Sequence, residues 1–211
     1  MRQAMSDAPE YWSRAKRKLA KTDPVFKRLI AAYPDEHLSS RRQLFQSLCQ
    51  AIVGQQISVA AASSIWARLR KAAGGRINPT RILALDYETL RGCGLSGRKA
   101  EYLTGVAETF RGAYRGLRWY EMDDEEIIDR LVALRGIGPW TANMVLIFTF
   151  LRPDVLPLLD IGLVRAVERH WNGGEPLARS EIEQLGEAWR PYRTVATWYL
   201  WRSIDDEAVA Y

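Results

Sequence analysis

The chain offers few side chains for acid–base or metal chemistry, which directs attention to its carboxylates. It holds two histidines, His37 and His170, and two cysteines, Cys49 and Cys93, all isolated from one another in the sequence. The sequence therefore contains no Cys-x-x-Cys pair and no His-Glu-x-x-His segment, and it predicts no metal site, no iron–sulfur cluster and no cofactor. We expect both cysteines to be buried apolar residues of a chain in a reducing compartment.

Asp160 is the carboxylate whose position is most informative. It directly precedes the apolar run Ile161 to Val167, where we expect a helix to begin. Aspartate is a favoured helix N-cap that stabilises a protein by about 1 kcal/mol, so capping alone would explain it. Because a cap also fixes the direction of the side chain, the same residue can be a catalytic carboxylate that stabilises a developing positive charge.

A glycine-rich turn lies 22 residues before Asp160 and immediately ahead of a strongly apolar helix. The turn consists of Gly136, Ile137 and Gly138, and Thr141 follows within the first helical turn. Glycines allow a sharp turn that exposes backbone N–H groups at a helix N-terminus, where the helix dipole also favours an anion. The turn therefore predicts a contact with one DNA phosphate, which positions a protein on DNA without reading its sequence.

A second Leu-Arg-Gly-x-Gly pattern occurs at residues 90–94. No apolar run follows it directly, and two glycines separated by one residue commonly mark a tight turn only. We interpret Gly92 and Gly94 in that way.

Helical spacing of apolar residues runs through almost the whole chain, while the alternation typical of strands is scarce. Asp23-Pro24, Ser58 and Asp123 are expected to start helices that end near Pro34, Gly74 and Arg135. The sequence thus predicts an all-α protein of about ten helices joined by short loops.

Charge and hydropathy set further limits. The formal net charge is +5 and the isoelectric point is near 9.3. Residues 66–118 hold eleven basic and four acidic side chains, which fits either a DNA-binding surface or a solvated helical face. The basic segment 1–22 lacks the apolar run of a signal peptide, and the longest apolar stretch, residues 144–151, is too short to span a bilayer. We expect a soluble cytoplasmic protein without membrane contact.

Three segments together carry a family resemblance: Gly54-Gln55-Gln56-Ile57-Ser58, the stretch from Leu134 to Ala142, and Asp160. In combination they resemble the helix–hairpin–helix DNA glycosylase superfamily, in particular its 3-methyladenine DNA glycosylase II branch, from about Asp23 to Trp201. The resemblance implies a bilobal all-α core over residues 23–211, with a DNA-binding cleft between the lobes. It also implies double-stranded DNA with damaged bases as the partner, a monomer, and association with the nucleoid if the source is bacterial.

The resemblance assigns roles to single residues. Asp160 would face the flipped nucleotide, and the hairpin residues Gly136 to Gly138 would hold the DNA backbone. Trp140 and Trp201 would line an aromatic base pocket, with Met144 on the same wall and Tyr192 nearby, although a tryptophan taken alone is more typical of a core position. Gln56 would fill the gap left by the flipped base, or it is a helix-end amide.

Two departures from the wider superfamily define the expected activity. Members that also cleave the DNA strand carry a lysine in the hairpin, and Trp140 stands at the position that resembles it, so no Schiff base and no lyase activity are expected. Some alkylpurine glycosylases have an additional N-terminal β-rich domain, whereas only about 20 residues precede the similar region here.

The expected function is therefore hydrolysis of the N-glycosidic bond of alkylated bases in base excision repair. Two alternatives stay open at this point. One is a glycosylase for oxidised or mismatched bases, and the other is a DNA-binding protein without catalytic activity.

Overall fold

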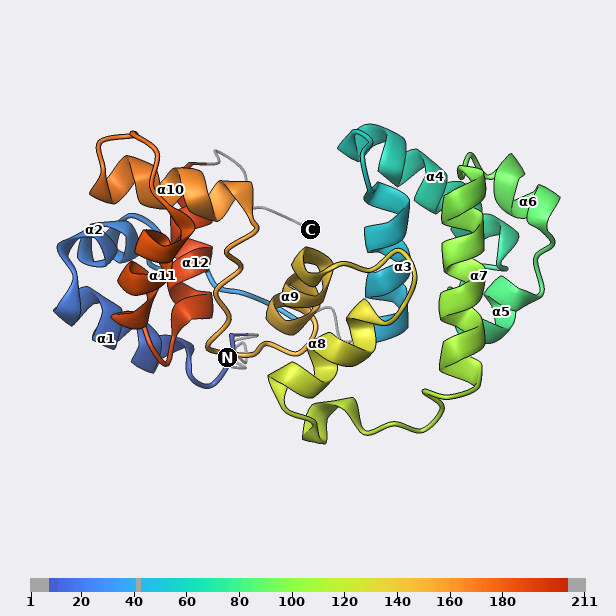
Figure 1. Cartoon of the computed structure of the whole chain (residues 1–211), viewed down its shortest axis with the longest axis horizontal. Helices are drawn as coiled ribbons and strands as arrows, with labels where there is room; N and C mark the ends of the chain where they lie inside the picture. Colours follow the sequence, from blue (N-terminus) through green and yellow to red (C-terminus); the bar gives the residue numbers. More distant parts are fainter. Residues whose placement is uncertain (1–7, 41–42, 205–211) are drawn as a thin grey trace, which may run out of the picture. The chain divides into compact units, whose positions relative to one another are not determined.

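The computed structural model describes residues 8–40 and 43–204, and every regular element among them is a helix (Figure 1). The all-α prediction is confirmed. In chain order the elements are α1 (Trp12–Thr22), α2 (Pro24–Ala32), α3 (Leu44–Gly54), α4 (Val59–Ala72), α5 (Pro79–Leu83), α6 (Tyr87–Gly92), α7 (Gly97–Arg111), the 3₁₀-helix η1 (Trp119–Glu121), α8 (Asp124–Val132), α9 (Pro139–Phe148), α10 (Ile161–Trp171), α11 (Arg179–Glu187) and α12 (Arg193–Arg202).

Polar side chains fix the starts of the helices that the sequence predicted. Asp23 accepts from the Val25 N–H at the start of α2, and Ser58 accepts from the Ala61 N–H at the start of α4. Each bond satisfies one of the backbone donors that a helix N-terminus leaves without an intrahelical partner. Asp123 caps α8 in the same way, and three acidic residues in the first turn of α8 complement its dipole.

The described part of the chain has twelve α-helices, two more than the sequence predicted. The shortest α-helices are α5 and α6, with five and six residues. Such helices complete fewer than two turns, so apolar spacing of 3.6 residues cannot reveal them. Their caps, Asn78 and Asp86, are the sequence features that mark them.

The chain divides into two compact units, which we call unit 1 (residues 1–40 and 146–211) and unit 2 (residues 41–145). In unit 1, α1 and α2 from the start of the sequence pack against α12 from its end, and α12 also packs against α10 (Figure 1). Its core is aromatic: Phe26 makes an edge contact with Trp189, and Trp12 makes one with Trp198.

The first helix belongs to unit 1. Trp12, Ala15 and Leu19 of α1 are buried, and α1 packs against α2 and α12. The basic side chains of α1 lie on the exposed face of this amphipathic helix, and the boundary predicted after residue 22 lies between α1 and α2.

In unit 2, α7 packs against α3, α5 and α6, and α3 also packs against α4. Phe45 and Phe110 meet edge to face in its core, and Trp119 stacks on Phe110. Cys49 and Cys93 are buried, as predicted, and burial raises the pKa of the Cys49 thiol well above its ordinary value.

Among the helices of residues 8–40 and 43–204, none combines the length and the apolar character that a membrane span requires. Within residues 8–40 and 43–204, no three His, Cys, Asp or Glu side chains form a group suited to a metal ion.

Candidate functional site

The carboxylate of Asp160 is buried in unit 1 at the N-terminus of α10. Its Oδ1 atom accepts the Leu163 N–H at 2.8 Å, which is the capping bond that the sequence predicted. Only 3% of the residue is exposed, so the carboxylate lies in a region of low dielectric where its charge acts strongly. The two flanking residues, Leu159 and Ile161, are 47% and 61% exposed.

Trp201 of α12 holds the same carboxylate oxygen. Its indole Nε1–H donates to Asp160 Oδ1 at 2.8 Å, and its ring stacks on Phe148 with the ring planes 9° apart. Gly162 leaves room for this approach, because a Cβ on that residue would lie 3.0 Å from Asp160 Oδ1 and 3.2 Å from the indole ring. Two N–H donors therefore fix the direction of the Asp160 side chain.

The loop that leads to Asp160 is anchored on the start of α12. Thr194 Oγ1 accepts the Val155 N–H at 2.9 Å and donates to the Arg152 carbonyl at 2.6 Å. The carboxylate of Asp154 accepts from the Arg193 guanidinium at 2.9 Å. Helix α12 thus supplies both the anchors of the loop and the indole that holds the carboxylate at its end.

The hairpin between α8 and α9 lies in unit 2 and contains two glycines with different surroundings. Gly136 has φ +93°, a conformation that favours glycine, and a Cβ on it would lie 2.4 Å from the Tyr102 ring. At Gly138 a Cβ would have no heavy atom within 4 Å. Gly136 is therefore required by the turn itself, whereas the backbone of Gly138 is open to an approaching group.

The remaining hairpin residues either form the turn itself or begin helix α9. Ile137 is 5% exposed and its N–H donates to the Leu134 carbonyl at 3.0 Å, so Ile137 closes the turn. Helix α9 begins at Pro139, which has no N–H, and the backbone bond from Ala142 to Gly138 starts its ladder. The side chain of Thr141 is 5% exposed, so a contact with an external anion would have to come from its backbone.

Gln56 lies in the connection between α3 and α4, also in unit 2. The residue is exposed and has φ +56°, a left-handed conformation that is rare outside glycine. The preceding side chain, Gln55, donates from Nε2 to the Gly136 carbonyl at 2.8 Å. The connection that carries Gln56 is thereby bonded to the hairpin.

The residues assigned to a base pocket are distributed over both units. Trp140 and Met144 lie one helical turn apart on α9 within unit 2, where Trp140 is half-buried and Met144 is 6% exposed. Trp201 is 2% exposed in unit 1. Tyr192 precedes α12, and its ring stacks on Tyr11 at a centroid distance of 6.4 Å.

The basic run at residues 66–118 stabilises turns within unit 2. Four of its arginines donate to backbone carbonyls of neighbouring turns: Arg68 to Cys93, Arg70 to Gly75, Arg81 to Ala73 and Arg91 to Leu95. The side chain of Arg68 also covers Gly94, which has φ +95° and forms the tight turn that the sequence predicted there.

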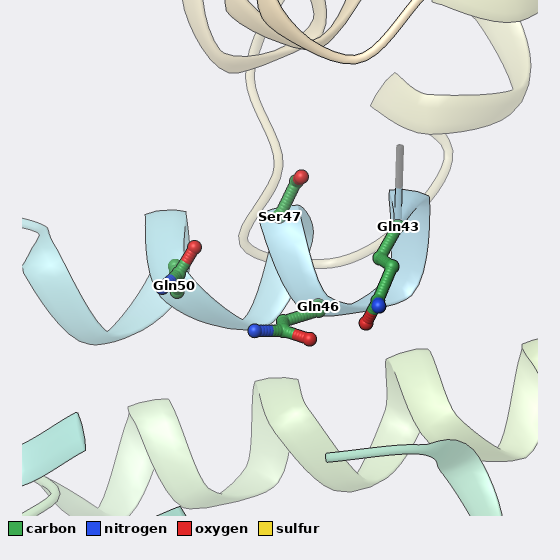
Figure 2. A pocket seen from close by; sticks show the side chains of 4 residues that line it. All are labelled: Gln43, Gln46, Ser47 and Gln50. Atoms are coloured by element: carbon green, nitrogen blue, oxygen red, sulfur yellow. The ribbon is translucent and has the colours of Figure 1, made fainter. Parts of the chain in front are cut away.

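A hollow of about 350 Å³ lies along α3 and is lined by Gln43, Gln46, Ser47 and Gln50 (Figure 2). These side chains can donate and accept hydrogen bonds, but none titrates near neutral pH. The hollow therefore offers polar contacts and no acid or base.

Comparison with known proteins places this arrangement in a family. The profile of the HhH-GPD superfamily base excision DNA repair proteins matches residues 49–191. The chain belongs to this superfamily. DNA-3-methyladenine glycosylase 1 of Schizosaccharomyces pombe is 31% identical to the chain over 180 residues, which are 83% of this chain and 79% of that protein.

Two solved structures of HhH-GPD relatives match nearly the whole chain. A DNA-3-methyladenine glycosidase of Bacillus halodurans has a TM-score of 0.81 and 34% identity, covering 96% of this chain and 92% of that one. The 3-methyladenine DNA glycosylase Mag1 of Schizosaccharomyces pombe, in complex with abasic DNA, has a TM-score of 0.78 and 29% identity, covering 90% and 96%.

Three residues of this HhH-GPD protein escaped the sequence interpretation: Gln55, Lys99 and Gly162. Gln55 is next to Gln56 in a segment that the sequence had already marked, so its position was visible and its bond to the hairpin was not. Lys99 bonds to the carbonyls of Val53 and Gln55, which lie 46 and 44 residues away. No local pattern encodes contacts at that separation.

Proposed function

We propose that this chain is a monofunctional DNA glycosylase that releases alkylated purines of the 3-methyladenine type from DNA in base excision repair. Relatives that match three quarters or more of this chain are named DNA-3-methyladenine glycosylases. The structure of one 3-methyladenine DNA glycosylase contains abasic DNA, which is the product of such a reaction. A chromosomal substrate would place its action in the compartment that holds the genome, which is the cytoplasm of a bacterial cell.

The observation that carries the proposal is the buried, doubly held carboxylate of Asp160. When the bond between C1′ and the base nitrogen breaks, the bonding electrons leave with the base and the sugar becomes an oxocarbenium-like cation. An ionised carboxylate fixed in a low-dielectric environment stabilises that cation without any reorganisation. Water then supplies the hydroxyl at C1′ and releases a proton, and an abasic site remains.

Trp201 contributes in this mechanism through Asp160. Its Nε1–H and the Leu163 N–H both point at Oδ1, so the carboxylate keeps one orientation while charge develops on the sugar. Preorganised groups of this kind lower the barrier because they need not move during the reaction. Trp201 is therefore a positioning residue for the catalytic carboxylate.

Selection of the base is assigned to Trp140, whose ring is half-buried. Alkylation of a ring nitrogen makes a purine cationic, and a cation is attracted to the electron-rich face of an indole. The same positive charge makes the base a good leaving group, so little protonation is required. We therefore expect neutral lesions to be poorer substrates.

The hairpin would hold the DNA backbone. A phosphate approaching the open backbone at Gly138 meets the N-terminus of α9, where the helix dipole favours a negative charge. Because a phosphate carries no information about the base, this contact would serve damaged and undamaged DNA alike.

The decisive experiment is incubation of the purified protein with methylated duplex DNA, followed by chromatography of the released bases. The proposal expects free 3-methyladenine and intact DNA strands with alkali-sensitive abasic sites. DNA binding without any released base would favour the catalytically silent alternative. A parallel incubation uses oxidised duplex DNA. Release of bases from the oxidised DNA alone would favour the alternative of a glycosylase for oxidised or mismatched bases.

The absence of lyase activity is tested separately by borohydride. A strand-cleaving glycosylase forms a Schiff base through a lysine, and borohydride converts it into a stable covalent adduct with DNA. We expect no adduct, because Trp140 stands where such a lysine would lie. A trapped adduct would mean that another amine attacks C1′.

A further inference from the structure

We propose that Lys99 and Gln55 are positioning residues that hold the segment Gln55 to Ser58, here called the plug loop, in the conformation that enters the DNA duplex. The inference rests on the proposed function, because it concerns insertion of Gln56 beside an extruded nucleotide. It adds two residues that act through the loop.

The plug loop has a conformation that requires support. Gln56 has φ +56°, and a non-glycine residue in the left-handed region costs about 1–2 kcal/mol. Such conformations persist only where surrounding contacts determine them. The side chains of Gln56 and Ile57 are exposed, so packing of the loop itself does not supply this support.

Lys99 supplies the first support. It lies in the first turn of α7, and its Nζ atom donates to the Val53 carbonyl at 2.8 Å and to the Gln55 carbonyl at 2.7 Å. A cation at the C-terminus of α3 also interacts favourably with the helix dipole. The Gln55 carbonyl belongs to the peptide that joins Gln55 to Gln56, so Lys99 fixes the peptide directly before the left-handed residue. Partial burial lowers the pKa of the Lys99 ammonium, as expected for a charge withdrawn from solvent.

Gln55 supplies the second support. Its Nε2 donates to the Gly136 carbonyl at 2.8 Å, which bonds the plug loop to the hairpin. At its other end the loop is fixed by Ser58, which caps α4. Movement of the hairpin toward a phosphate would therefore carry the plug loop with it, and the depth of insertion would be set by the backbone contact.

These contacts serve binding more than folding. They fix a loop whose side chains are exposed, with Ile57 38% and Val59, just beyond it, 84% exposed. Hydrogen bonds that serve folding alone would be expected to fix residues whose side chains are buried in the core. Removal of Lys99 is thus expected to reduce insertion into DNA while the described core of unit 2 stays packed.

Insertion can be measured with a duplex that carries 2-aminopurine opposite a tetrahydrofuran abasic analogue, because unstacking of 2-aminopurine raises its fluorescence. We expect the wild-type protein to raise the fluorescence at saturation and Lys99→Met to shift the insertion equilibrium by about tenfold, the value of a hydrogen bond to a charged group. Lys99→Arg, which keeps a charged donor, should restore part of the signal. Gln55→Met, which keeps the chain length and removes the amide donor, should lower it.

The matched control is Lys71→Met on α4, which removes an exposed lysine from the same unit. This variant should behave as wild type. A wild-type signal from both Lys99→Met and Gln55→Met, an equal loss from Lys71→Met, or no signal from the wild-type protein would each overturn the inference. Should Lys99→Met not fold, Gln55→Met decides alone. Because the readout uses an abasic duplex, failure of base release by the wild-type protein would refute the proposed function and leave this test valid.

Discussion

Helices α9 and α10 differ in the residues that precede their first turns. Helix α10 has its own anion, since Asp160 Oδ1 accepts the Leu163 N–H inside the protein. Helix α9 follows Gly138 and begins with Pro139, neither of which has a side-chain acceptor for the first-turn donors. We call the start of α10, which Asp160 caps, the closed helix start, and the start of α9, where a Cβ on Gly138 would have open space, the open helix start.

This difference separates two tasks that a repair glycosylase requires. A closed helix start holds a carboxylate in one direction, which suits stabilisation of a transition state. An open helix start binds any phosphate, which suits attachment to DNA of every sequence. The proposed function therefore assigns chemistry to the start of α10 and backbone contact to the start of α9.

The largest expected effect comes from removing the charge at the closed helix start. Asp160→Asn keeps a capping side chain, so the protein should fold, but it should slow base release on the order of 10³-fold. Affinity for DNA should stay the same or improve, because the charge acts on the transition state. Single-turnover release of methylated bases, together with equilibrium binding, measures both.

The control is Asp123→Asn, which changes an equivalent cap at the start of α8. It should retain normal release. If Asp160→Asn released bases as fast as the parent, Asp160 would be a structural cap and nothing more.

A smaller effect on base release is expected when Asp160 loses one of its hydrogen-bond donors. Trp201→Phe removes the 2.8 Å bond to Oδ1 and keeps an aromatic ring beside Phe148. Loss of one hydrogen bond to a charged group should slow base release about 10- to 100-fold. Trp198→Phe on the same helix, which also replaces a buried indole, should leave the rate per folded molecule unchanged. Equal losses in both variants would mean that the packing of α12 sets the rate.

The open helix start is tested at Gly138. The Cβ of a valine there would have no heavy atom within 4 Å outside the two adjacent residues, so folding should be retained, but the side chain would obstruct an approaching phosphate. Affinity for damaged and undamaged duplexes should fall alike, by about tenfold, and base preference should persist. Binding titrations with both duplexes measure this.

Gly136→Ala serves as the contrasting variant. It should lower thermal stability, since its backbone has φ +93° and its Cβ would collide with Tyr102. Loss of selectivity with retained bulk affinity in folded Gly138→Val would contradict the division of tasks between the two helix starts.

The smallest effect is expected at Trp140. Trp140→Ala should reduce the preference for cationic over neutral bases about fivefold, the value of one cation–π contact of roughly 1 kcal/mol. Affinity for undamaged DNA should hardly change. Competition between 3-methyladenine and a neutral lesion in one duplex mixture measures the preference directly, and an unchanged ratio would remove Trp140 from base selection.

The sequence predicted what depends on neighbouring residues. The caps Asp23, Ser58, Asp123 and Asp160 each bond to an N–H two or three positions further along, so a local pattern was sufficient to find them. The bond from Trp201 to Asp160 joins residues 41 positions apart, and only the folded chain brings them together.

The two Leu-Arg-Gly-x-Gly segments show the same limit. Their sequences are alike, yet the covered glycine is the second one in the first segment, where Gly94 lies under Arg68, and the first one in the second segment, where Gly136 lies against Tyr102. Helix α7, which follows Gly94, is capped by Ser96, whereas Gly138 before α9 has no side chain to cap with. The amino acids outside each segment decide which of its two glycines is covered.

The division of unit 1 between the two ends of the sequence bears on how the protein is made. Unit 2 is one continuous stretch, residues 41–145, so all of it has been synthesised before α10 and α12 exist. Helices α1 and α2 can meet their partner α12 only after α12 has left the ribosome. At about 5–20 residues per second, synthesis from α2 to the end of α12 takes roughly 10–35 s, and during that time the apolar faces of α1 and α2 lack the contacts that α12 later supplies.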